Sequence, residues 1–512
     1  MVNKDIKLNV EELATFCKKK GITFQAAEIY GGMAGFFDFG PTGVEIRNNL
    51  KNIYWKNFVH KREEIFGQDG SIITNPKVWK ASGHIDTFGD MLLTTKDTKT
   101  KLRADHFIED TLNIAADGMG PEEIEALILK HDLKYNGEDF ELPIKFFSGM
   151  LKTQIGADIT KQSEGYLRPE TAQSIFPNFK LIAETTRAKL PFGIIQIGKA
   201  FRNEISPRDF VFRCREFEQM ELEYFFNPET NCELLTDKQL NTKFKLWSAK
   251  NQDAGDTSMI DITIKEMIDK KMLNDYHGYW LAEFYNFFTE IIGMNVDNLR
   301  IREHVKTELS HYSTATFDID YNFSFGFKEM VGMAYRGNYD LVQHQTVSNQ
   351  KLEFFDEASK TKILPHVIEP SVGVDRFMMA TIYEAYNNDK KRGNVVLNFK
   401  PEIAPTKVCI CPLMNKPELV KIARQLFEDF IDEDIISVYD KSGSIGKRYA
   451  RNDEIGTPYT LTIDYETIEE GENKGTITIR DRDSTQQKRI AIDTATGILI
   501  SLIKEKIKFE DL

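Results

Sequence analysis

The chain has 512 residues, of which 41% are hydrophobic and 28% charged, and it carries a formal net charge of −13. This composition excludes a largely disordered protein, and the length predicts two or three domains. The acidic balance excludes a protein that coats nucleic acid nonspecifically, but it allows one that holds an RNA through local basic patches.

The N-terminal sequence MVNKDIKLNVEELATFCKKKG mixes acidic and basic residues and contains no apolar stretch. It has neither the apolar core of a secretory signal nor the acid-poor, Arg-rich character of a transit peptide. No apolar run in the chain is long enough to cross a bilayer. We therefore expect a cytoplasmic protein with no membrane partner.

Residues 21–106 begin with a Gly-rich segment. An amphipathic helix around Val44–Phe66 and a strand near Gly70–Asn75 are predicted to follow. The helix has one apolar stripe, made of Val44, Leu50, Ile53, Tyr54 and Phe58. Such a stripe suits a core helix or a dimer interface, and its periodicity does not separate the two.

Two segments are predicted to be mainly helical insertions, 107–160 and 227–300. The first contains EEIEALILKHDLK at helical spacing, and the second contains closely spaced aromatic and Met residues. Residues 161–226 alternate as strands do, and strand patterns return over 314–376.

The segment KKRGNVVLNFKPEIAPTK is a predicted linker between a first domain, 1–400, and a C-terminal domain, 404–512. The second domain alternates strand and helix, with VCICPLM, then ELVKIARQLFEDFIDED, then YTLTIDYETI and GTITIRDRDS as a hairpin-like pair. Of five scattered cysteines, only Cys409 and Cys411 lie close together. We expect buried thiols on one strand face, and neither a disulfide framework nor a structural zinc.

The segment Phe201–Phe226 is predicted to form strand, loop and strand. Its alternation places Arg213, Arg215, Phe217, Gln219, Glu221 and Glu223 on one face, and Met220, Leu222 and Tyr224 on the other. Arg202 and Glu204 share a face of the preceding strand. Arg202 is suited to an α-phosphate, Phe217 to stacking on a purine and Glu204 to the amino group of adenine. The alternative is a solvated hairpin with surface ion pairs.

A second segment, PHVIEPSVGVDRFMMA, passes from strand into helix. Gly373 would let the backbone approach a ligand. Arg376 would lie over a purine opposite Phe217, a cation–π contact worth about 1–2 kcal/mol when desolvated. The alternative is an ordinary turn with a surface arginine.

Together with the N-terminal helix and strand, these segments resemble motifs 1, 2 and 3 of class II aminoacyl-tRNA synthetases. Finer matches resemble the dimeric (α2) glycyl-tRNA synthetases over nearly the whole chain. They are EIYGGMAGFFDFGPTGVEIRNNL, VWKASGH, LRADH, YLRPETAQSIF, LPFGIIQIGKAFRNEISPRDFVFRCREFEQMELEYF, REHVKTELSHYSTATFDID, VIEPSVGVDR and GSIGKRYARNDEIGTPY. The resemblance implies an α+β fold: an antiparallel sheet flanked by helices, helical insertions and a C-terminal α/β anticodon-binding domain.

The same resemblance implies a homodimer that uses ATP, glycine and tRNA(Gly), with Mg²⁺ bound alongside ATP. It assigns glycine binding to Arg103, Glu170, Phe217, Glu218, Gln219, Met220, Glu221, Glu369 and Ser371. It assigns ATP binding to Arg202, Asn203, Glu204, Phe212, Arg213, Phe217, Glu329, Met330, Gly373 and Arg376. Arg202 and Arg376 would be catalytic, and Glu329 would help to hold Mg²⁺.

Polar groups packed against Cα of glycine would leave no room for a methyl group, so we expect no editing domain. The carboxylate of glycine is already ionised near neutral pH, so attack on ATP needs positioning rather than a general base. The most basic patch of the C-terminal domain, Lys441, Lys447, Arg448 and Arg451, is predicted to bind tRNA. The alternative for this patch is a solvated loop and helix face.

Two other functions remain open. One is a class II synthetase for another small amino acid such as serine, threonine or proline. The other is a noncatalytic nucleic-acid-binding relative, which we would expect to lose the motif arginines; Arg202, Arg215 and Arg376 are all present. A class I synthetase is disfavoured because no HIGH- or KMSKS-like segment occurs.

Overall fold

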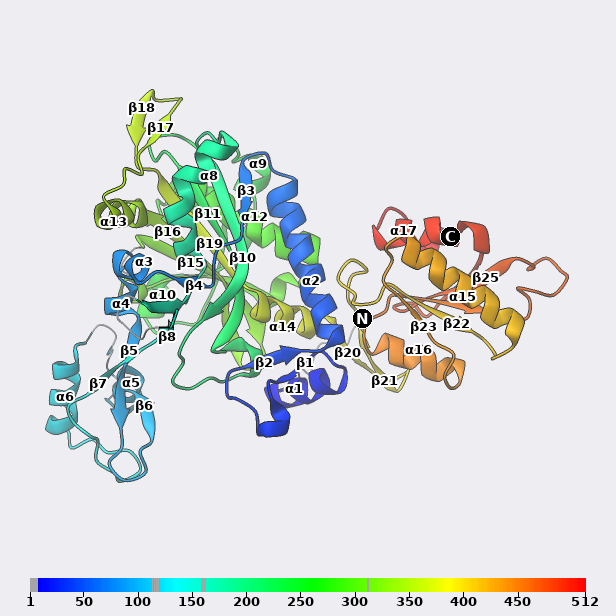
Figure 1. Cartoon of the computed structure of the whole chain (residues 1–512), viewed down its shortest axis with the longest axis horizontal. Coiled ribbons are helices and arrows are strands. Elements are labelled where there is room, and N and C mark those ends of the chain that lie inside the picture. Colours follow the sequence, from blue (N-terminus) through cyan, green and yellow to red (C-terminus); the bar gives the residue numbers. More distant parts are fainter. Residues whose placement is uncertain (1–7, 113, 115, 117–118, 158–162, 311–312) are drawn as a thin grey trace.

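The computed structural model describes residues 8–512 except 113, 115, 117–118, 158–162 and 311–312. The start of the N-terminal segment, parts of 107–160 and two residues of REHVKTELSHYSTATFDID therefore lie outside the described residues. A large body is followed by a smaller C-terminal lobe, drawn in orange and red (Figure 1).

The body is built on one nine-stranded sheet. Its strands, in order across the sheet, are β13 (Ile260–Thr263), β12 (Lys243–Trp247), β14 (Leu299–Glu303), β15 (Ala315–Phe323), β16 (Gly326–Gly337), β19 (His366–Gly373), β11 (Glu216–Phe226), β10 (Phe192–Phe201) and β3 (Ile65–Gln68). All neighbours are antiparallel except β12 with β14 and β10 with β3. The predicted antiparallel sheet is confirmed.

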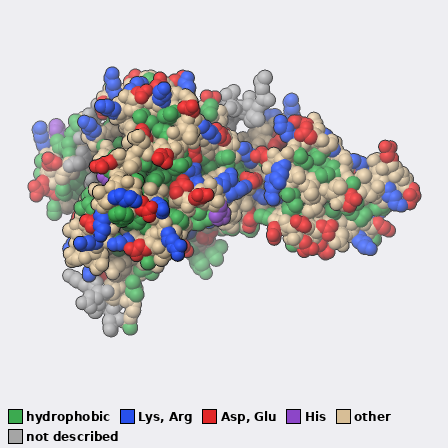
Figure 2. Space-filling model, turned by 90° about the horizontal axis from the view of Figure 1, so that it is seen from above, with side chains coloured by type: hydrophobic (Ala, Val, Ile, Leu, Met, Phe, Trp, Pro, Cys, Tyr) green, Lys and Arg blue, Asp and Glu red, His purple; other side chains and the backbone are tan. Residues whose placement is uncertain are grey.

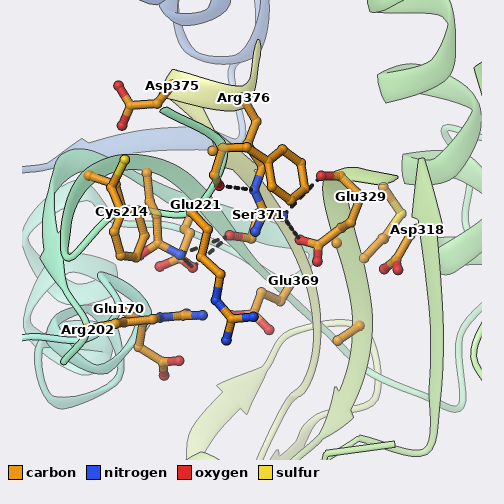
Figure 3. Close-up of a pocket in the computed structure, with 18 of the residues that line it drawn as sticks. Glu170, Arg202, Cys214, Glu221, Asp318, Glu329, Glu369, Ser371, Asp375 and Arg376 are labelled. Atoms are coloured by element: carbon orange, nitrogen blue, oxygen red, sulfur yellow. Dashed lines mark hydrogen bonds and ion pairs between the residues drawn. The ribbon is translucent and has the colours of Figure 1, made fainter. Parts of the chain in front are cut away.

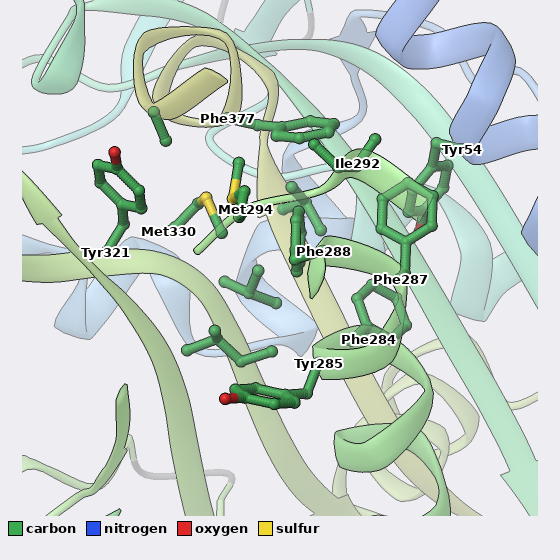
Figure 4. Close-up of a cluster of buried hydrophobic side chains, with 14 of the residues drawn as sticks. Tyr54, Phe284, Tyr285, Phe287, Phe288, Ile292, Met294, Tyr321, Met330 and Phe377 are labelled. Carbon is green, nitrogen blue, oxygen red and sulfur yellow. The ribbon is translucent and has the colours of Figure 1, made fainter. Parts of the chain in front are cut away.

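One face of this sheet is covered by α2 (Pro41–Trp55), α12 (Asp275–Asn286) and α14 (Val374–Ala385). Met220, Leu222 and Tyr224 of β11 point into this cluster, as their alternation predicted, and are fully buried. Figure 4 shows aromatic side chains of α2, of α12 and of the turn after α12 in one cluster with Met294 and Met330. Each large apolar side chain buried here stabilises the fold by about 1.5–3 kcal/mol.

The predicted helix over Val44–Phe66 begins earlier and ends earlier. It spans Pro41–Trp55, continues as a π-helical turn over Lys56–His60, and gives way to β3. Its stripe residues Leu50, Ile53, Tyr54 and Phe58 are buried in the core. The core interpretation of the stripe is therefore confirmed, while Val44 remains 40% exposed.

The opposite face of the sheet is covered at one end only. There α7 (Ala172–Ile175), α8 (Phe179–Thr186) and α13 (Tyr339–Ser348) pack against the sheet around Phe179, Phe192 and Phe225. The other end of this face carries polar side chains and stays open. That open end forms the cavity described below.

The segment 107–160, predicted to be a mainly helical insertion, contains strands as well as helices. Its helices are α5 (Ala104–Leu112) and α6 (Pro121–Lys130), and its strands are β7 (Lys145–Ser148) and β8 (Leu151–Gln154). Strand β7 pairs with β5 (Gly89–Thr94), which also pairs with β6 (Lys101–Arg103). Strand β8 pairs with β9 (Glu164–Leu167), which also pairs with β4 (Ile73–Thr74). Figure 1 shows α5, α6 and β5–β7 projecting from the body.

The segment 227–300 is also mixed. It contains α9 (Asp237–Leu240), α10 (Ala249–Asp253), α11 (Ile264–Asp269) and α12, but β12 and β13 extend the edge of the main sheet. The remaining elements of the body are α1 (Val10–Lys19), β1 (Thr23–Gln25), β2 (Phe37–Phe39), α3 (Pro76–Ala81), α4 (His84–Thr87), β17 (Phe354–Asp356), β18 (Thr361–Ile363), β20 (Tyr386–Asp389) and β21 (Asn394–Leu397).

The C-terminal lobe has its own hydrophobic cluster and a five-stranded sheet. Its elements are β22 (Val408–Pro412), α15 (Pro417–Asp432), β23 (Ser437–Tyr439), α16 (Ile445–Asp453), β24 (Tyr459–Ile463), β25 (Thr476–Asp481), β26 (Gln487–Ala491) and α17 (Ala495–Ile503). The predicted strand pair β24–β25 is antiparallel, and β22 lies parallel to β23 and β24. Cys409 and Cys411 are buried on one face of β22, as predicted, with 3.4 Å between their Sγ atoms.

Within the described part of the chain, no helix combines the length and the apolar character needed to cross a membrane. Acidic and basic side chains are interspersed over both lobes on the face seen in Figure 2. The net acidity is therefore spread over this face rather than gathered in one patch.

Candidate active site

The open end of the sheet forms a cavity bounded by β11, β16 and β19, the start of α14 and the loop between β10 and β11 (Figure 3). Thirteen of the predicted site residues line it. They are Glu170, Arg202, Glu204, Phe212, Arg213, Phe217, Gln219, Glu221, Glu329, Glu369, Ser371, Gly373 and Arg376. The alternation of β11 brings Phe217, Gln219 and Glu221 to the cavity, because these side chains share the uncovered face of the sheet.

Glu221 is the most firmly held carboxylate of the cavity. It accepts hydrogen bonds from the backbone N–H groups of Thr171 (2.8 Å) and Ala172 (2.7 Å), where α7 begins. It also accepts bonds from the Thr171 hydroxyl, the Gln219 amide (3.0 Å) and the Ser371 hydroxyl (2.8 Å). Five donors fix the orientation of this side chain.

Glu170, Glu221, Glu369 and Ser371 together form what we call the acidic niche. Burial opposes ionisation of Glu170, but His84, 3.3 Å away, and the more distant Arg336 and Arg202 hold its pKa well below the ordinary value. Glu369 behaves differently. Burial raises its pKa to about 8 against the opposing effect of Arg336, and Glu221 adds to the increase. The niche is therefore acidic and lined by polar atoms.

Arg336 binds Glu369 of the niche without lining the cavity itself, and it was not among the predicted site residues. Its guanidinium is buried, donates to Glu369 at 2.7 Å and donates to Asp340 at 2.7 and 2.8 Å. A single arginine in a strand is usually exposed, so no local pattern marks Arg336 as buried. His84 was also not singled out, although it lies in the matched segment VWKASGH.

The guanidinium group of Arg202 lines the cavity. Its Nε donates to the carbonyl of Pro169 at 3.1 Å, and its terminal nitrogens have no partner among the described residues. The guanidinium lies 5.3 Å from the ring centre of Phe217. Figure 3 shows it beside Glu170. This arrangement fits an anionic group placed next to the acidic niche.

The other two arginines predicted to bind ATP, Arg213 and Arg376, are already paired. Arg213 donates to Glu204 at 2.7 Å. Arg376 lies 3.1 Å from the carboxylate of Glu329 and 4.2 Å above the ring centre of Phe212. Arg376 is thus stacked on Phe212, and its predicted position over a purine opposite Phe217 stays a prediction, because it concerns a bound nucleotide. A Cβ added at Gly373 would make ordinary van der Waals contact with the side chain of Arg376.

Three predicted residues point away from the cavity. Met220 and Met330 are buried in the core on the covered face of the sheet. Glu218 lies on the same face as Met220 and binds Arg47 at 2.6 Å and Lys51 at 3.2 Å. Strand alternation excludes direct contact of these side chains with a ligand in the cavity, so we omit all three from the proposed site.

Three more residues lie beside the cavity rather than in it. Asn203 binds the carbonyls of Gly149 and Ser148 in the neighbouring segment. Arg103 lines a separate cleft, where it pairs with Asp90 at 3.2 Å and with Asp105; this cleft shares Glu204 and Arg213 with the cavity. Arg215, predicted on the open face, instead binds backbone carbonyls of Glu204 and Ala34 and holds the loop.

The predicted basic patch of the C-terminal lobe is split. Lys441 and Lys447 are exposed. Arg448 is only 4% exposed, because its guanidinium binds the carbonyls of Pro412 (2.6 Å) and Gly443 (3.0 Å). Arg451 pairs with Asp440. The expectation that Arg448 contacts a ligand from the surface is therefore not supported by its position.

For a metal, the cavity offers one exposed acid. Glu329 has 47% of its side chain exposed at the cavity rim, and the nearby Asp318 is engaged by His304 (2.7 Å) and Arg302 (3.0 Å). Among the described residues, no group of three or more His, Cys, Asp or Glu side chains is arranged to hold an ion. A single carboxylate fits Mg²⁺ that is held mainly by phosphate oxygens.

The chain is similar to several known proteins. Residues 407–502 match the family model described as "Anticodon binding domain". Over 98% of its length the chain is 41% identical to the whole "Glycine--tRNA ligase" of Caldanaerobacter subterraneus subsp. tengcongensis. Over 96% of its length it is 42% identical to 99% of the protein of that name from Mesoplasma florum. A crystal structure of prolyl-tRNA synthetase from Cryptosporidium parvum, complexed with L-proline and AMP, matches 97% of this chain and 78% of its own with 13% identity and a TM-score of 0.55.

An antiparallel sheet with a polar cavity, followed by a lobe that matches an anticodon-binding domain, defines an aminoacyl-tRNA synthetase. Identity of about 40% across nearly the full length narrows the class further. The chain belongs to the glycine–tRNA ligase family.

Proposed function

We propose that the protein joins glycine to ATP, forming glycyl-adenylate and pyrophosphate, and then transfers glycine to the 3′ end of tRNA(Gly) with release of AMP. The observation that carries this proposal is the acidic niche lying directly beside the free guanidinium of Arg202. An ammonium group and a phosphate need these opposite charges next to each other.

Glycine would place its ammonium among Glu170, Glu221 and Glu369. The niche suits so small a substrate because its walls are fixed: Glu221 holds five hydrogen bonds, and Glu369 is tied to Arg336. A larger amino acid would have to displace hydrogen-bonded polar atoms, which costs more than filling an apolar pocket gains.

ATP would lie along the arginines. Arg202 would hold the α-phosphate, Arg213 and Arg376 would neutralise the remaining phosphates, and Phe212 and Phe217 would flank the base. Glu329 would help to bind Mg²⁺, which neutralises phosphate charge when it is bound. Because the substrate carboxylate is already ionised, these residues need only align it with the α-phosphorus and stabilise the developing charge.

We further propose the division into a catalytic domain, 1–400, and an anticodon-binding domain, 404–512. The separate hydrophobic clusters of the two parts support it. Lys441 and Lys447 are the patch residues best exposed to contact tRNA. Arg451 would contribute less to tRNA binding, because it is paired with Asp440.

A cytoplasmic homodimer is the assembly we propose. Large apolar side chains are exposed near the N-terminus: Ile29 is 89%, Tyr30 86% and Met33 54% accessible. Such side chains are typical of a surface that another subunit covers. Sedimentation analysis of the protein and of Tyr30→Glu tests this; a monomeric wild-type protein would contradict it.

The decisive experiment is exchange of radiolabelled pyrophosphate into ATP with a panel of amino acids. Glycine should support exchange, and alanine, serine, threonine and proline should support it at least about a hundredfold less well. Preferential exchange with any of the other four would overturn the proposed specificity. No exchange with any amino acid would instead favour a noncatalytic role.

A further inference from the structure

Two carboxyl side chains face each other across the sheet behind the acidic niche. The pairing of Glu221 with Ser371 and of Tyr224 with Ile368 places Glu223 of β11 opposite Glu369 of β19. Side chains opposite each other in an antiparallel pair share a face, with Cβ atoms about 4.5–5.5 Å apart. Two ionised carboxylates in this arrangement would repel each other.

Glu223 has no means of holding a negative charge by itself. Its side chain is fully buried, and neither of its carboxyl oxygens has a hydrogen-bond partner among the described residues. Leaving a buried ionised carboxylate unpaired costs several kcal/mol. The neutral acid, in contrast, carries a proton that it can donate to a neighbouring carboxylate.

The groups that face Glu223 do not supply a spare cation. Among the described residues, the charged groups with the largest effect on Glu223 are Glu369 on β19, Arg336 on β16, Glu221 on the same strand and Asp340 on α13. On the other side, β10 places the apolar Ile194 opposite Glu223. Arg336 is committed to Asp340 and Glu369. Negative charge therefore exceeds positive charge around Glu223.

We propose that Glu223 and Glu369 share one proton in the free enzyme, and that the ammonium group of glycine displaces this proton into solvent when it binds. The inference rests on the proposed binding of glycine in the acidic niche. On displacement, the O–H bond of the carboxylic acid breaks, water takes up the proton, and the ammonium group together with Arg336 compensates the two carboxylates that remain. No oxidation or reduction is involved.

The electrostatic surroundings of the pair agree with this arrangement. Burial and the facing Glu369 raise the pKa of Glu223 well above its ordinary value. Burial likewise raises the pKa of Glu369 to about 8. An arriving ammonium group favours the charged carboxylates and lowers both pKa values. Glu223 does not line the cavity, so it is a positioning residue that acts through Glu369.

Linkage gives the sign of the effect on glycine binding. Below the pKa of the pair, glycine has to expel a proton, so its KM rises as pH falls. The slope for release of one proton is about tenfold in KM per pH unit. The KM for ATP should not follow this profile, because ATP does not contact the pair.

The test compares two single variants with the wild-type protein. One is Glu223→Gln, and the other is the control Glu353→Gln, which changes an exposed glutamate outside the cavity. Glutamine has the size of the protonated acid and can donate N–H in place of O–H to Glu369. We expect the wild-type and control proteins to show the KM rise for glycine from about pH 8 down to about pH 6, and Glu223→Gln to show less than about threefold change over that range. An unchanged slope in Glu223→Gln would overturn the proposal.

Infrared difference spectroscopy of the wild-type protein provides a second, independent measurement. The free protein should show the carbonyl band of a protonated carboxylic acid that shifts in D₂O, and saturating glycine should remove it. Absence of the band from the free protein, or a band that glycine leaves unchanged, would overturn the shared proton. If pyrophosphate exchange shows that another amino acid is the substrate, the band of the free protein still decides whether the pair is protonated.

Discussion

Arg336 and Asp340 form a bidentate ion pair beneath the acidic niche, with Nε–Oδ2 and Nη2–Oδ1 distances of 2.7 and 2.8 Å. The remaining terminal nitrogen of Arg336 binds Glu369 at 2.7 Å. One buried guanidinium thus connects helix α13 to strand β19. The position of Glu369 in the niche depends on a residue that does not itself line the cavity.

Replacing Arg336 with Met should strongly destabilise the body of the protein. The change leaves Asp340 and Glu369 buried without their cation, which costs about 3–5 kcal/mol. Urea denaturation monitored by tryptophan fluorescence measures the loss. Arg336→Lys keeps the charge but not the planar fork, and it should lose less. Equal urea midpoints for wild type and Arg336→Met would contradict the assigned role.

Replacing Arg202 with Ala should reduce ATP–pyrophosphate exchange by about 10²–10³-fold, the loss expected for one preorganised donor to a transition-state anion. Its matched control is Arg208→Ala in the same loop, where the side chain is 61% exposed. The control should exchange pyrophosphate normally. Near-normal exchange in Arg202→Ala would refute the proposed contact with the α-phosphate.

The split of the basic patch predicts two different phenotypes. Lys441→Ala combined with Lys447→Ala should raise the KM for tRNA several-fold and leave pyrophosphate exchange unchanged, because both side chains lie on the surface of the C-terminal lobe. Arg448→Ala should instead lower the thermal stability of that lobe, since the carbonyls of Pro412 and Gly443 lose their donor, at about 1–3 kcal/mol for the buried carbonyl of Pro412. Identical behaviour of the two variants would show that burial does not separate their roles.

A chain that ends at Ala404 should still form glycyl-adenylate but should fail to charge tRNA. Ala404 is kept because its carbonyl accepts a hydrogen bond from Asn49 of α2 at 3.0 Å. The C-terminal lobe has its own hydrophobic cluster, so its removal leaves the core of the body intact. Pyrophosphate exchange and tRNA charging, measured on the same preparation, separate the two steps; undiminished charging would count against the assigned role of residues 404–512.

Acid should destabilise the protein through His344. Burial lowers its pKa to about 4, whereas the unfolded chain titrates near 6.5. The neutral ring therefore stabilises the fold fully above about pH 6.5, and this contribution, up to about 3 kcal/mol, is lost as pH falls towards 4. Urea midpoints measured across this range should fall less steeply for His344→Gln. Parallel curves for the two proteins would exclude His344 as the source.

Much of the site could be predicted from local patterns. The alternation of β11 assigned Gln219 and Glu221 to one face and Met220 to the other, because a strand has a period of two. The same rule shows why Glu218, taken over from the family resemblance, faces α2 instead. Sequence periodicity was therefore the better guide where the two disagreed.

The features that escaped prediction depend on distant pairings. Arg448 is buried because the carbonyl of Pro412, 36 residues earlier, accepts its hydrogen bond. Glu223 gains its significance only from the register that sets it against Glu369. The strands β5 and β7 are short and separated by two helices, so nothing local marks them as partners in a sheet. Such relationships arise only when the chain has folded.

The internal pairs Arg213–Glu204 and Arg376–Glu329 have a consequence for ATP bound as proposed. A phosphate group that reaches Arg213 or Arg376 would have to compete with the carboxylate already paired there, whereas one that reaches Arg202 would not. A singly charged ion would therefore gain little at the two paired arginines. A ligand that brings several negative charges, together with a divalent cation to compensate the displaced Glu329, would make the exchange favourable there.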